Sequence, residues 1–141
     1  MLNKQAGTIY ESEFKTNALK KGLDVFPSEG DYSIVDCVVL NPAGKAFRVQ
    51  IKGTQCCLFS DGVGRKPSAN KFKIVVCKSK TKSGMSAKEV DVLACYIQPR
   101  NTWYIIPMIK AVDRKTLAFY LVDDSKSQWE PYRDNWDVFF N

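Results

Sequence analysis

The chain has 141 residues, of which 45% are hydrophobic and 26% charged, a balance that excludes a disordered chain and a membrane-embedded one. Lysine and arginine outnumber aspartate and glutamate by 21 to 15, and the resulting net charge of +6 favours a polyanionic partner, nucleic acid above all. Histidine is absent, which excludes Ser-His-Asp and Cys-His catalysis and any imidazole-ligated metal. A hydrolase of this composition must rely on carboxylates, lysine, tyrosine or an oxygen-bound metal.

The first half of the chain predicts one helix and then strands. Ala6, Tyr10, Phe14 and Ala18 recur every four residues and predict a helix over 3–21. Short apolar or alternating runs separated by turn residues then predict strands at 23–26, 34–40 and 46–52.

The second half predicts further strands and short helical segments. A Gly/Pro/Ser-rich loop is expected at 53–70 and a Lys/Ser/Gly-rich loop at 78–88. The expected elements are strands at 72–77, 90–97, 103–106 and 117–122, a short helix at 107–112 and an aromatic-rich C-terminal helix. Helices flanking a mixed central sheet indicate an α/β or α+β fold in one domain.

The five cysteines are Cys37, Cys56, Cys57, Cys77 and Cys95. Their odd number and the absence of a C-x-x-C pair predict reduced thiols, three of them buried in apolar runs, with a redox-active Cys56–Cys57 pair as the alternative. Because the N-terminus lacks an apolar signal core, we expect a cytoplasmic or otherwise intracellular protein.

The register of the second and third strands decides which polar side chains meet. A five-residue loop pairs Leu40 with Ala46, and the same register places Asp36 opposite Gln50 and Lys52 opposite Ile34. A slip of one residue would put Asp36 and Lys52 on opposite faces of the sheet.

The helix supplies a further acid. Glu11 lies within about 60° of Phe14 and Ala18 around the helix and is expected on its inner part, whereas Glu13 points about 160° away and should be solvated. Glu11, Asp36 and the Gln50 amide are hard oxygen ligands suited to Mg²⁺. Lys52 would lower the pKa of a metal-bound water or stabilise charge on an attacked phosphate.

Each of these residues also has a structural alternative. Asp36 would then be a hydrogen-bonded residue of the core or the sheet edge, and Glu11 would pair with Lys15 one turn along the helix. The run from Gln50 to Lys52 would be an ordinary solvent face. Asp31 is a rival acid that turn chemistry explains well.

These motifs, in this order, resemble those of the PD-(D/E)XK nuclease superfamily. They are Gly7-x-x-x-Glu11, Asp36 within Ser-Ile-Val-Asp-Cys-Val-Val, and Gln50-Ile51-Lys52. The resemblance is greatest to the Holliday-junction-resolvase-like branch and to group I intron homing endonucleases of this fold. The segments Val-Asp-Val-Leu-Ala-Cys-Tyr, Trp-Tyr-Ile-Ile-Pro and Tyr-Arg-Asp-Asn-Trp-Asp-Val-Phe extend it over most of the chain.

The resemblance implies an Mg²⁺-dependent, site-specific endonuclease of double-stranded DNA, of the homing type, with Mn²⁺ as a substitute metal. A Holliday-junction resolvase or other structure-specific nuclease, and a non-catalytic DNA-binding module, are the alternatives. The resemblance also implies a restriction-endonuclease-like fold in a single nuclease domain over 1–141. Its catalytic core would span about 1–80, and the strands and helix of 90–141 would complete the sheet and the subunit contacts.

The resemblance also assigns the site residues by position. Glu11 and Asp36 become metal ligands, Lys52 the catalytic lysine, Gln50 the residue at the (D/E) position, and the Ile51 backbone carbonyl a further ligand. Two positions depart from the family pattern: Val35 replaces the proline before the aspartate, and the neutral Gln50 replaces an acid, which weakens the case for two metals.

Basic residues follow the predicted catalytic strands. They are Arg65, Lys66, Lys71, Lys73, Lys78, Lys80, Lys82 and Lys88, with no acid between the first and the last. We expect Arg65, Lys66, Lys71, Lys73 and the earlier Arg48 to contact DNA phosphates, although a solvated lysine-rich loop is the alternative. The three tryptophans are expected to pack in the core or between subunits rather than stack on bases. Because cutting both strands needs two sites, we expect a homodimer or homotetramer.

Overall fold

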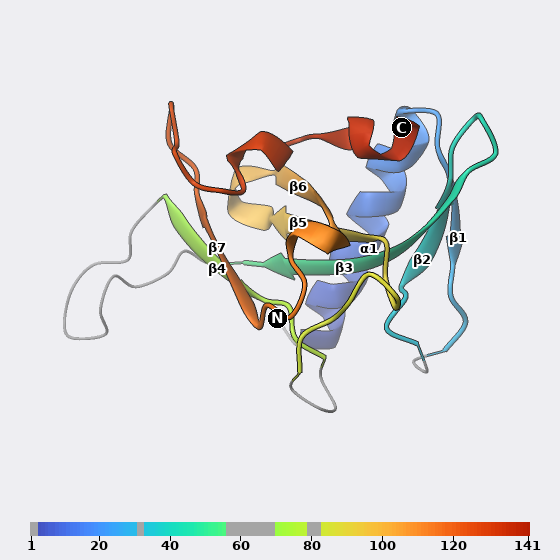
Figure 1. Ribbon diagram of the computed structural model, residues 1–141, viewed down its shortest axis with the longest axis horizontal. Helices are drawn as coiled ribbons and strands as arrows, with labels where there is room; N and C mark the ends of the chain where they lie inside the picture. Colours follow the sequence, from blue (N-terminus) through green and yellow to red (C-terminus); the bar gives the residue numbers. More distant parts are fainter. Residues whose placement is uncertain (1–2, 31–32, 56–69, 79–82) are drawn as a thin grey trace.

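The computed structural model describes residues 3–30, 33–55, 70–78 and 83–141, and these form one α-helix, a five-stranded mixed sheet and a two-stranded sheet (Figure 1). The predicted fold class, a mixed sheet flanked by helical elements, is confirmed. The elements are α1 (Asn3–Lys20), β1 (Asp24–Pro27), β2 (Cys37–Leu40), β3 (Ala46–Thr54), β4 (Lys71–Val75), β5 (Val92–Ile97), β6 (Thr102–Pro107) and β7 (Thr116–Tyr120), with short 3₁₀ helices η1 (Gln98–Arg100), η2 (Met108–Lys110), η3 (Glu130–Tyr132) and η4 (Trp136–Phe140).

The helix α1 forms where the four-residue apolar repeat predicts it. Its buried stripe is Ala6, Tyr10, Phe14 and Ala18, and the last two are completely shielded from solvent. Gly22 follows the helix with a φ of +86°, a conformation that glycine adopts without steric cost. The stripe fixes which side of α1 faces the sheet.

The five-stranded sheet has the order β1-β2-β3-β5-β6, with β3 in the centre. β3 pairs antiparallel with β2 and parallel with β5, while the remaining neighbours are antiparallel. The predicted register between β2 and β3 is confirmed, because Leu40 pairs with Ala46 and Cys37 with Val49.

The β2–β3 ladder is shorter than predicted. It begins at Cys37 instead of Ile34, so the predicted pairing of Lys52 with Ile34 is wrong, and Lys52 pairs with Cys95 of β5. The backbone of Asp36 is the last point of contact, since its N–H donates to the Val49 carbonyl at 2.8 Å. Beyond this point β3 continues without β2.

Separate hydrophobic clusters cover the two faces of the sheet. On one face, α1 and η4 pack against Val49 and Ile51, and Phe14 meets the rings of Trp103 and Trp136 at centroid distances of 5.5 and 5.4 Å. On the other face, the β4–β7 sheet packs against β5 and β6, with Trp129 in this second cluster (Figure 1). The predicted core role of the tryptophans is confirmed, because all three are at most 5% exposed.

The C-terminal segment covers the sheet with short helices. Where single helices were predicted at 107–112 and at the C-terminus, the chain forms the 3₁₀ helix η2 and the pair η3 and η4. The buried Asn41 amide ties this end to the β2–β3 turn by donating to the Phe139 carbonyl at 2.8 Å. Within the described residues, no helix combines the length and apolar character needed to cross a membrane.

The described cysteines match their prediction in part. Cys37, Cys77 and Cys95 are free thiols, but only Cys37 and Cys95 are buried, whereas Cys77 is partly exposed. Cys56, Cys57 and most of the predicted loop at 53–70 lie outside the described residues, and Gly53 and Thr54 extend β3.

Phe14 is the centre of the aromatic cluster between α1 and the sheet. We predict that Phe14→Ala lowers the free energy of unfolding by about 3–5 kcal/mol, because it leaves a cavity that its rigid aromatic neighbours fill poorly. Denaturant unfolding followed by tryptophan fluorescence measures this. The exposed Leu19→Ala on the same helix is the control, and an equal loss in both variants would contradict the assigned core.

Candidate active site

The Asp36 carboxylate is fixed at the point where β2 leaves β3. Its Oδ2 accepts a hydrogen bond from the Ile51 backbone N–H at 2.7 Å and another from the Gln50 side-chain Nε2 at 2.8 Å. Asp36 is only partly buried. The charge is therefore oriented by two donors of β3 while remaining accessible.

The alternation of backbone groups explains this arrangement. In an antiparallel ladder, the N–H and C=O of one residue point to the same neighbouring strand. Val49 directs its carbonyl to β2, so Ile51, two residues later, directs its N–H and C=O to the same side. No β2 strand residue pairs with Ile51. The Asp36 side chain takes the N–H, and the Ile51 carbonyl faces the same gap, 3.5 Å from Gln50 Nε2.

A hollow between α1 and the first strands brings Glu11 to the same place. Its polar lining includes Glu11, Ser12 and Lys15 from α1 and Asp36, the residue before β2, and it is also lined by Cys37 and Ile51. The two predicted acids thus line one hollow together with the β3 backbone. Lys15 was considered in the sequence only as an ion-pair partner of Glu11, from which its offset of four residues places it on the same side of the helix. Ser12 was not predicted, since it is offset by about 100° from Glu11 around the helix.

The two glutamates of α1 flank its buried stripe. Measured from the centre of the four-residue apolar repeat, Glu11 and Glu13 lie about 80° away on opposite sides. Glu11 lines the hollow, but its side chain is exposed, so the predicted position on the inner part of the helix is wrong. Glu13 is partly buried rather than solvated. The pKa of Tyr96 is raised mainly by the burial of its own side chain, and the negative charge of Glu13 adds to this increase.

The pKa of Cys37 is affected by the negative charges at this hollow. Burial raises the pKa of its thiol to about 12, and the charges of Asp36 and Glu11 add to the increase. The thiol therefore stays protonated at neutral pH and behaves as a small apolar side chain.

Gln50 and Lys52 lie on the other face of β3. They pair with Leu93 and Cys95, which belong to the cluster opposite α1. Gln50 is buried, and its side chain donates a hydrogen bond to Asp36. Lys52, two residues later on the strand, is partly buried. The structure thus joins Glu11, Asp36 and Ile51 at the hollow and links Gln50 to Asp36. Lys52 lies on the same strand face as Gln50, and neither residue is among those that line the hollow.

The donor set is one of hard oxygen atoms. Among the described residues, no three His, Cys, Asp or Glu side chains gather as a metal cluster. A cation at the hollow would have to combine the two carboxylates with neutral amide or carbonyl oxygens and water, which is a set that suits Mg²⁺ better than a soft metal.

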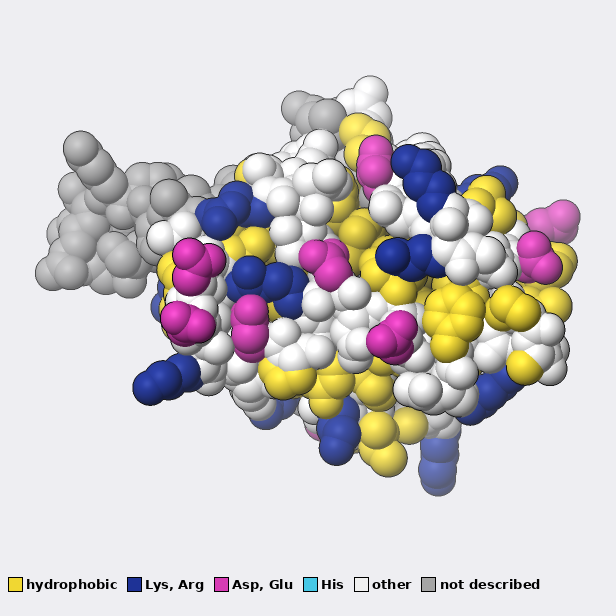
Figure 2. Space-filling model, turned by 90° about the horizontal axis from the view of Figure 1, so that it is seen from above, with side chains coloured by type: hydrophobic (Ala, Val, Ile, Leu, Met, Phe, Trp, Pro, Cys, Tyr) yellow, Lys and Arg dark blue, Asp and Glu magenta, His cyan; other side chains and the backbone are white. Residues whose placement is uncertain are grey.

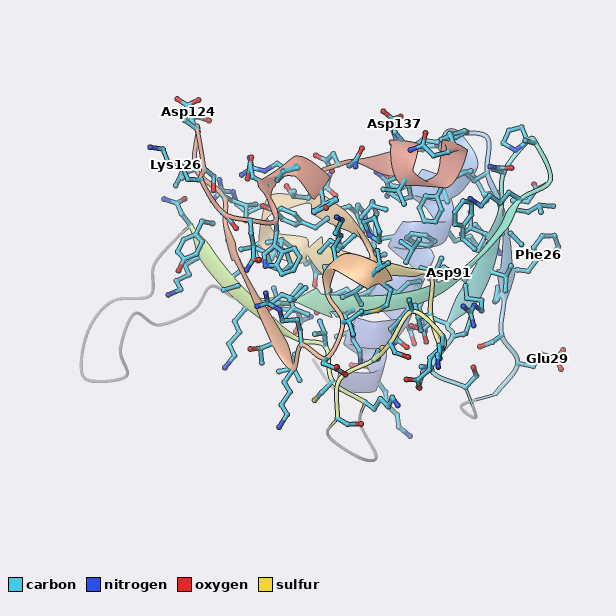
Figure 3. All side chains as sticks on the ribbon, in the orientation of Figure 1. Phe26, Glu29, Asp91, Asp124, Lys126 and Asp137 are labelled. Carbon is cyan, nitrogen blue, oxygen red and sulfur yellow. The ribbon has the colours of Figure 1, made fainter. Side chains whose placement is uncertain are left out.

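Arg48 has a structural role that its sequence position did not reveal. Its guanidinium pairs with Asp91 through Nε at 3.0 Å and Nη2 at 2.9 Å, and it donates to the carbonyls of Lys88 and Ala87. Figure 3 shows Asp91 beside this junction of the 83–91 segment with β3. The contact of Arg48 with a DNA phosphate remains a prediction, and such a contact would compete with these four hydrogen bonds.

Of the remaining residues predicted to contact DNA, the structure describes Lys71 and Lys73 only. Lys71 and Lys73 share the outer face of β4, since Phe72 and Ile74 between and after them are buried. The Lys71 ammonium lies 5.2 Å from the centre of the Tyr120 ring. Arg65, Lys66 and the rival acid Asp31 lie outside the described residues.

The sequence profile of the PD-(D/E)XK endonuclease family matches residues 1–139. The chain therefore belongs to the PD-(D/E)XK endonuclease family, which confirms the resemblance noted in its motifs and supports nuclease activity.

A solved structure shares the fold. A bacterial homing endonuclease, I-Ssp6803I, superposes with a TM-score of 0.74 at 18% sequence identity, over 97% of this chain and 90% of that one. At this identity the likeness establishes the architecture. A search of curated proteins gives no significant match.

The Arg48–Asp91 pair gives a prediction about pH. Hydrogen bonding to Arg48 holds the pKa of Asp91 below its usual range, despite partial burial. A lowered pKa stabilises the fold above the unfolded-state pKa of about 3.9, and this contribution is lost as the pH falls through the folded-state value. We expect Asp91→Ala to lower the melting temperature at pH 7 and to differ less from the parent near pH 3. The exposed Asp137→Ala is the control, and a pH-independent deficit in Asp91→Ala would contradict the assignment.

Proposed function

We propose that this protein is an Mg²⁺-dependent endonuclease that cuts double-stranded DNA at specific sites, as a homing endonuclease does. The supporting observation is the Asp36 carboxylate, fixed on the open end of β3 at a hollow that Glu11 also lines. Membership of an endonuclease family and a fold shared with a homing endonuclease support the same conclusion.

Each site residue has a role in this proposal. Glu11, Asp36, the Ile51 carbonyl and the Gln50 amide oxygen would hold Mg²⁺, or Mn²⁺ in its place. When bound, the ion would activate a water and neutralise charge at the phosphate. Asp36 is already oriented by the hydrogen bond from the Ile51 backbone N–H, which belongs to the central strand and can stay in place when the ion binds. The Lys52 ammonium would stabilise the negative charge that develops on the attacked phosphate.

The neutral Gln50 limits the charge of the site. Two carboxylates at the hollow, instead of three, favour one divalent ion over two. Gln50 is also the feature that supports the second candidate function, a DNA-binding module of the same fold without catalysis. The two functions differ in whether DNA is cut when Mg²⁺ is present.

The charge distribution supports the approach of DNA from one side of the protein. The C-terminal segment 121–141 carries the acids Asp123, Asp124, Glu130, Asp134 and Asp137 against the bases Lys126 and Arg133. Figure 2 shows acidic side chains on the face on this side, with lysine and arginine side chains between them, and Asp124 and Asp137 project from it in Figure 3. DNA would be repelled there and would instead meet the lysine-bearing outer face of β4. We further propose a homodimer or higher even oligomer, because cutting both strands requires two sites.

Cleavage tests the proposal directly. We expect the parent to nick supercoiled plasmid with Mg²⁺ and not with EDTA, and Lys52→Ala or Asp36→Ala to lower the rate by about 100-fold or more. Lys20→Ala and Asp137→Ala, both at exposed sites, control for loss of charge.

Parallel linear-duplex and four-way-junction substrates resolve the type of nuclease. Site-specific cleavage of duplex supports the homing type, whereas a strong preference for junctions would support a resolvase. Binding without cleavage of any DNA would replace the enzyme by the binding module.

The outer face of β4 gives a prediction about DNA affinity. Each phosphate contact releases counterions, so removing one lowers the slope of log K against log salt by about 1. We expect Lys73→Ala to reduce the slope by this amount for all DNA sequences, measured by fluorescence anisotropy in the absence of divalent metal. Lys20→Ala, at the end of α1, should leave it unchanged. Equal slopes for the parent and Lys73→Ala would remove β4 from the DNA interface.

A further inference from the structure

The Gln50 carboxamide lies between two oxygen atoms assigned above to the metal. Its Nε2 is 2.8 Å from Asp36 Oδ2 and 3.5 Å from the Ile51 carbonyl oxygen. An ionised carboxylate and a backbone carbonyl are both acceptors, so only the NH₂ end of the amide can face them. The orientation of the amide is therefore dictated by its neighbours.

We propose that the Gln50 NH₂ group takes the place of the cation in the metal-free protein, and that the amide turns over when a divalent cation binds. This inference rests on the function proposed above and concerns the state of the same site without metal. The partial positive charges of the two N–H bonds hold Asp36 and the Ile51 carbonyl close together. Without these donors, the two acceptors would repel each other and draw water into the gap.

Cation binding reverses the electrostatics at this position. A divalent ion held by Asp36 and the Ile51 carbonyl would repel an NH₂ group and attract the amide oxygen. Gln50 is only 6% exposed, so its side chain cannot swing into solvent. A rotation of about 180° about its last torsion exchanges nitrogen and oxygen without moving the rest of the chain, because that torsion has a broad, roughly two-fold profile.

The same reasoning explains what a glutamine contributes that an acid would not. An ionised glutamate at position 50 cannot donate to Asp36, and it would place a second carboxylate where the amide nitrogen now lies, 2.8 Å from Asp36 Oδ2. The metal-free form would then be strained by like charges and would depend on the cation. Gln50 thus makes the fold independent of metal, at the expense of affinity for it.

Side-chain amide signals test the rotation. In the ¹⁵N-labelled parent, the Gln50 NH₂ pair is identified by its loss in Gln50→Glu, and Mg²⁺ is titrated without DNA. We expect the Gln50 pair to shift together with the Ile51 backbone amide. If the Ile51 amide shifts and the Gln50 pair does not, the rotation is overturned while the metal site stands. If neither responds, the rotation and the Mg²⁺ site of the proposed function are both overturned.

Thermal unfolding supplies a second readout. We expect metal-free Gln50→Glu to melt below the parent, and Mg²⁺ to raise its melting temperature by more than that of the parent. Gln128→Glu makes the same change at an exposed site and should behave like the parent. Equal melting temperatures and equal Mg²⁺ shifts in Gln50→Glu and the parent would overturn the role of the amide.

Discussion

The site depends on the early end of one strand pairing. β2 begins at Cys37, so Ile51 in the central strand has no β2 residue opposite it and its backbone groups face a gap. A buried, unpaired N–H is costly, and the Asp36 carboxylate meets this need at 2.7 Å. The hydrogen bond that completes the sheet therefore also orients the charge on which the proposed chemistry depends.

The rest of the fold keeps β3 rigid at this point. One face of the strand is packed by α1 and its aromatic cluster, and the other by the cluster that includes the β4–β7 sheet. The parallel ladder with β5 runs from Val49 to Thr54, so it holds Gln50, Ile51 and Lys52 where β2 no longer does. A site built on a central strand between two packed layers is held more precisely than one on a loop.

Much of the fold follows from local patterns in the sequence. The four-residue apolar repeat of α1 and the short β2–β3 loop predict the helix, the hairpin and its register, because each depends on neighbouring residues. The convergence of Glu11 and Asp36 follows from these elements. The sequence does not show where the ladder ends, because this depends on how the backbone diverges after the Asp36–Val49 contact. The pairing of Lys52 with Ile34 was wrong for this reason.

Contacts between residues far apart in the chain could not be predicted from the sequence either. Arg48 lies on a strand face that favours a phosphate contact, and its partner Asp91 is 43 residues away, with no local signal to connect them. The burial of Glu13 near Tyr96 likewise depends on how α1 is rotated against the sheet, which a single apolar stripe fixes only approximately.

In the proposed function, Glu11 and the Asp36 carboxylate, held by the open end of β3, form one cation site. Crystals of the protein soaked in Mn²⁺ test this site, because the anomalous signal of the ion locates it without reference to activity. We expect an anomalous peak in the hollow, coordinated by Asp36 and Glu11. A hollow without a peak at saturating Mn²⁺, or a peak coordinated by other residues, would contradict it.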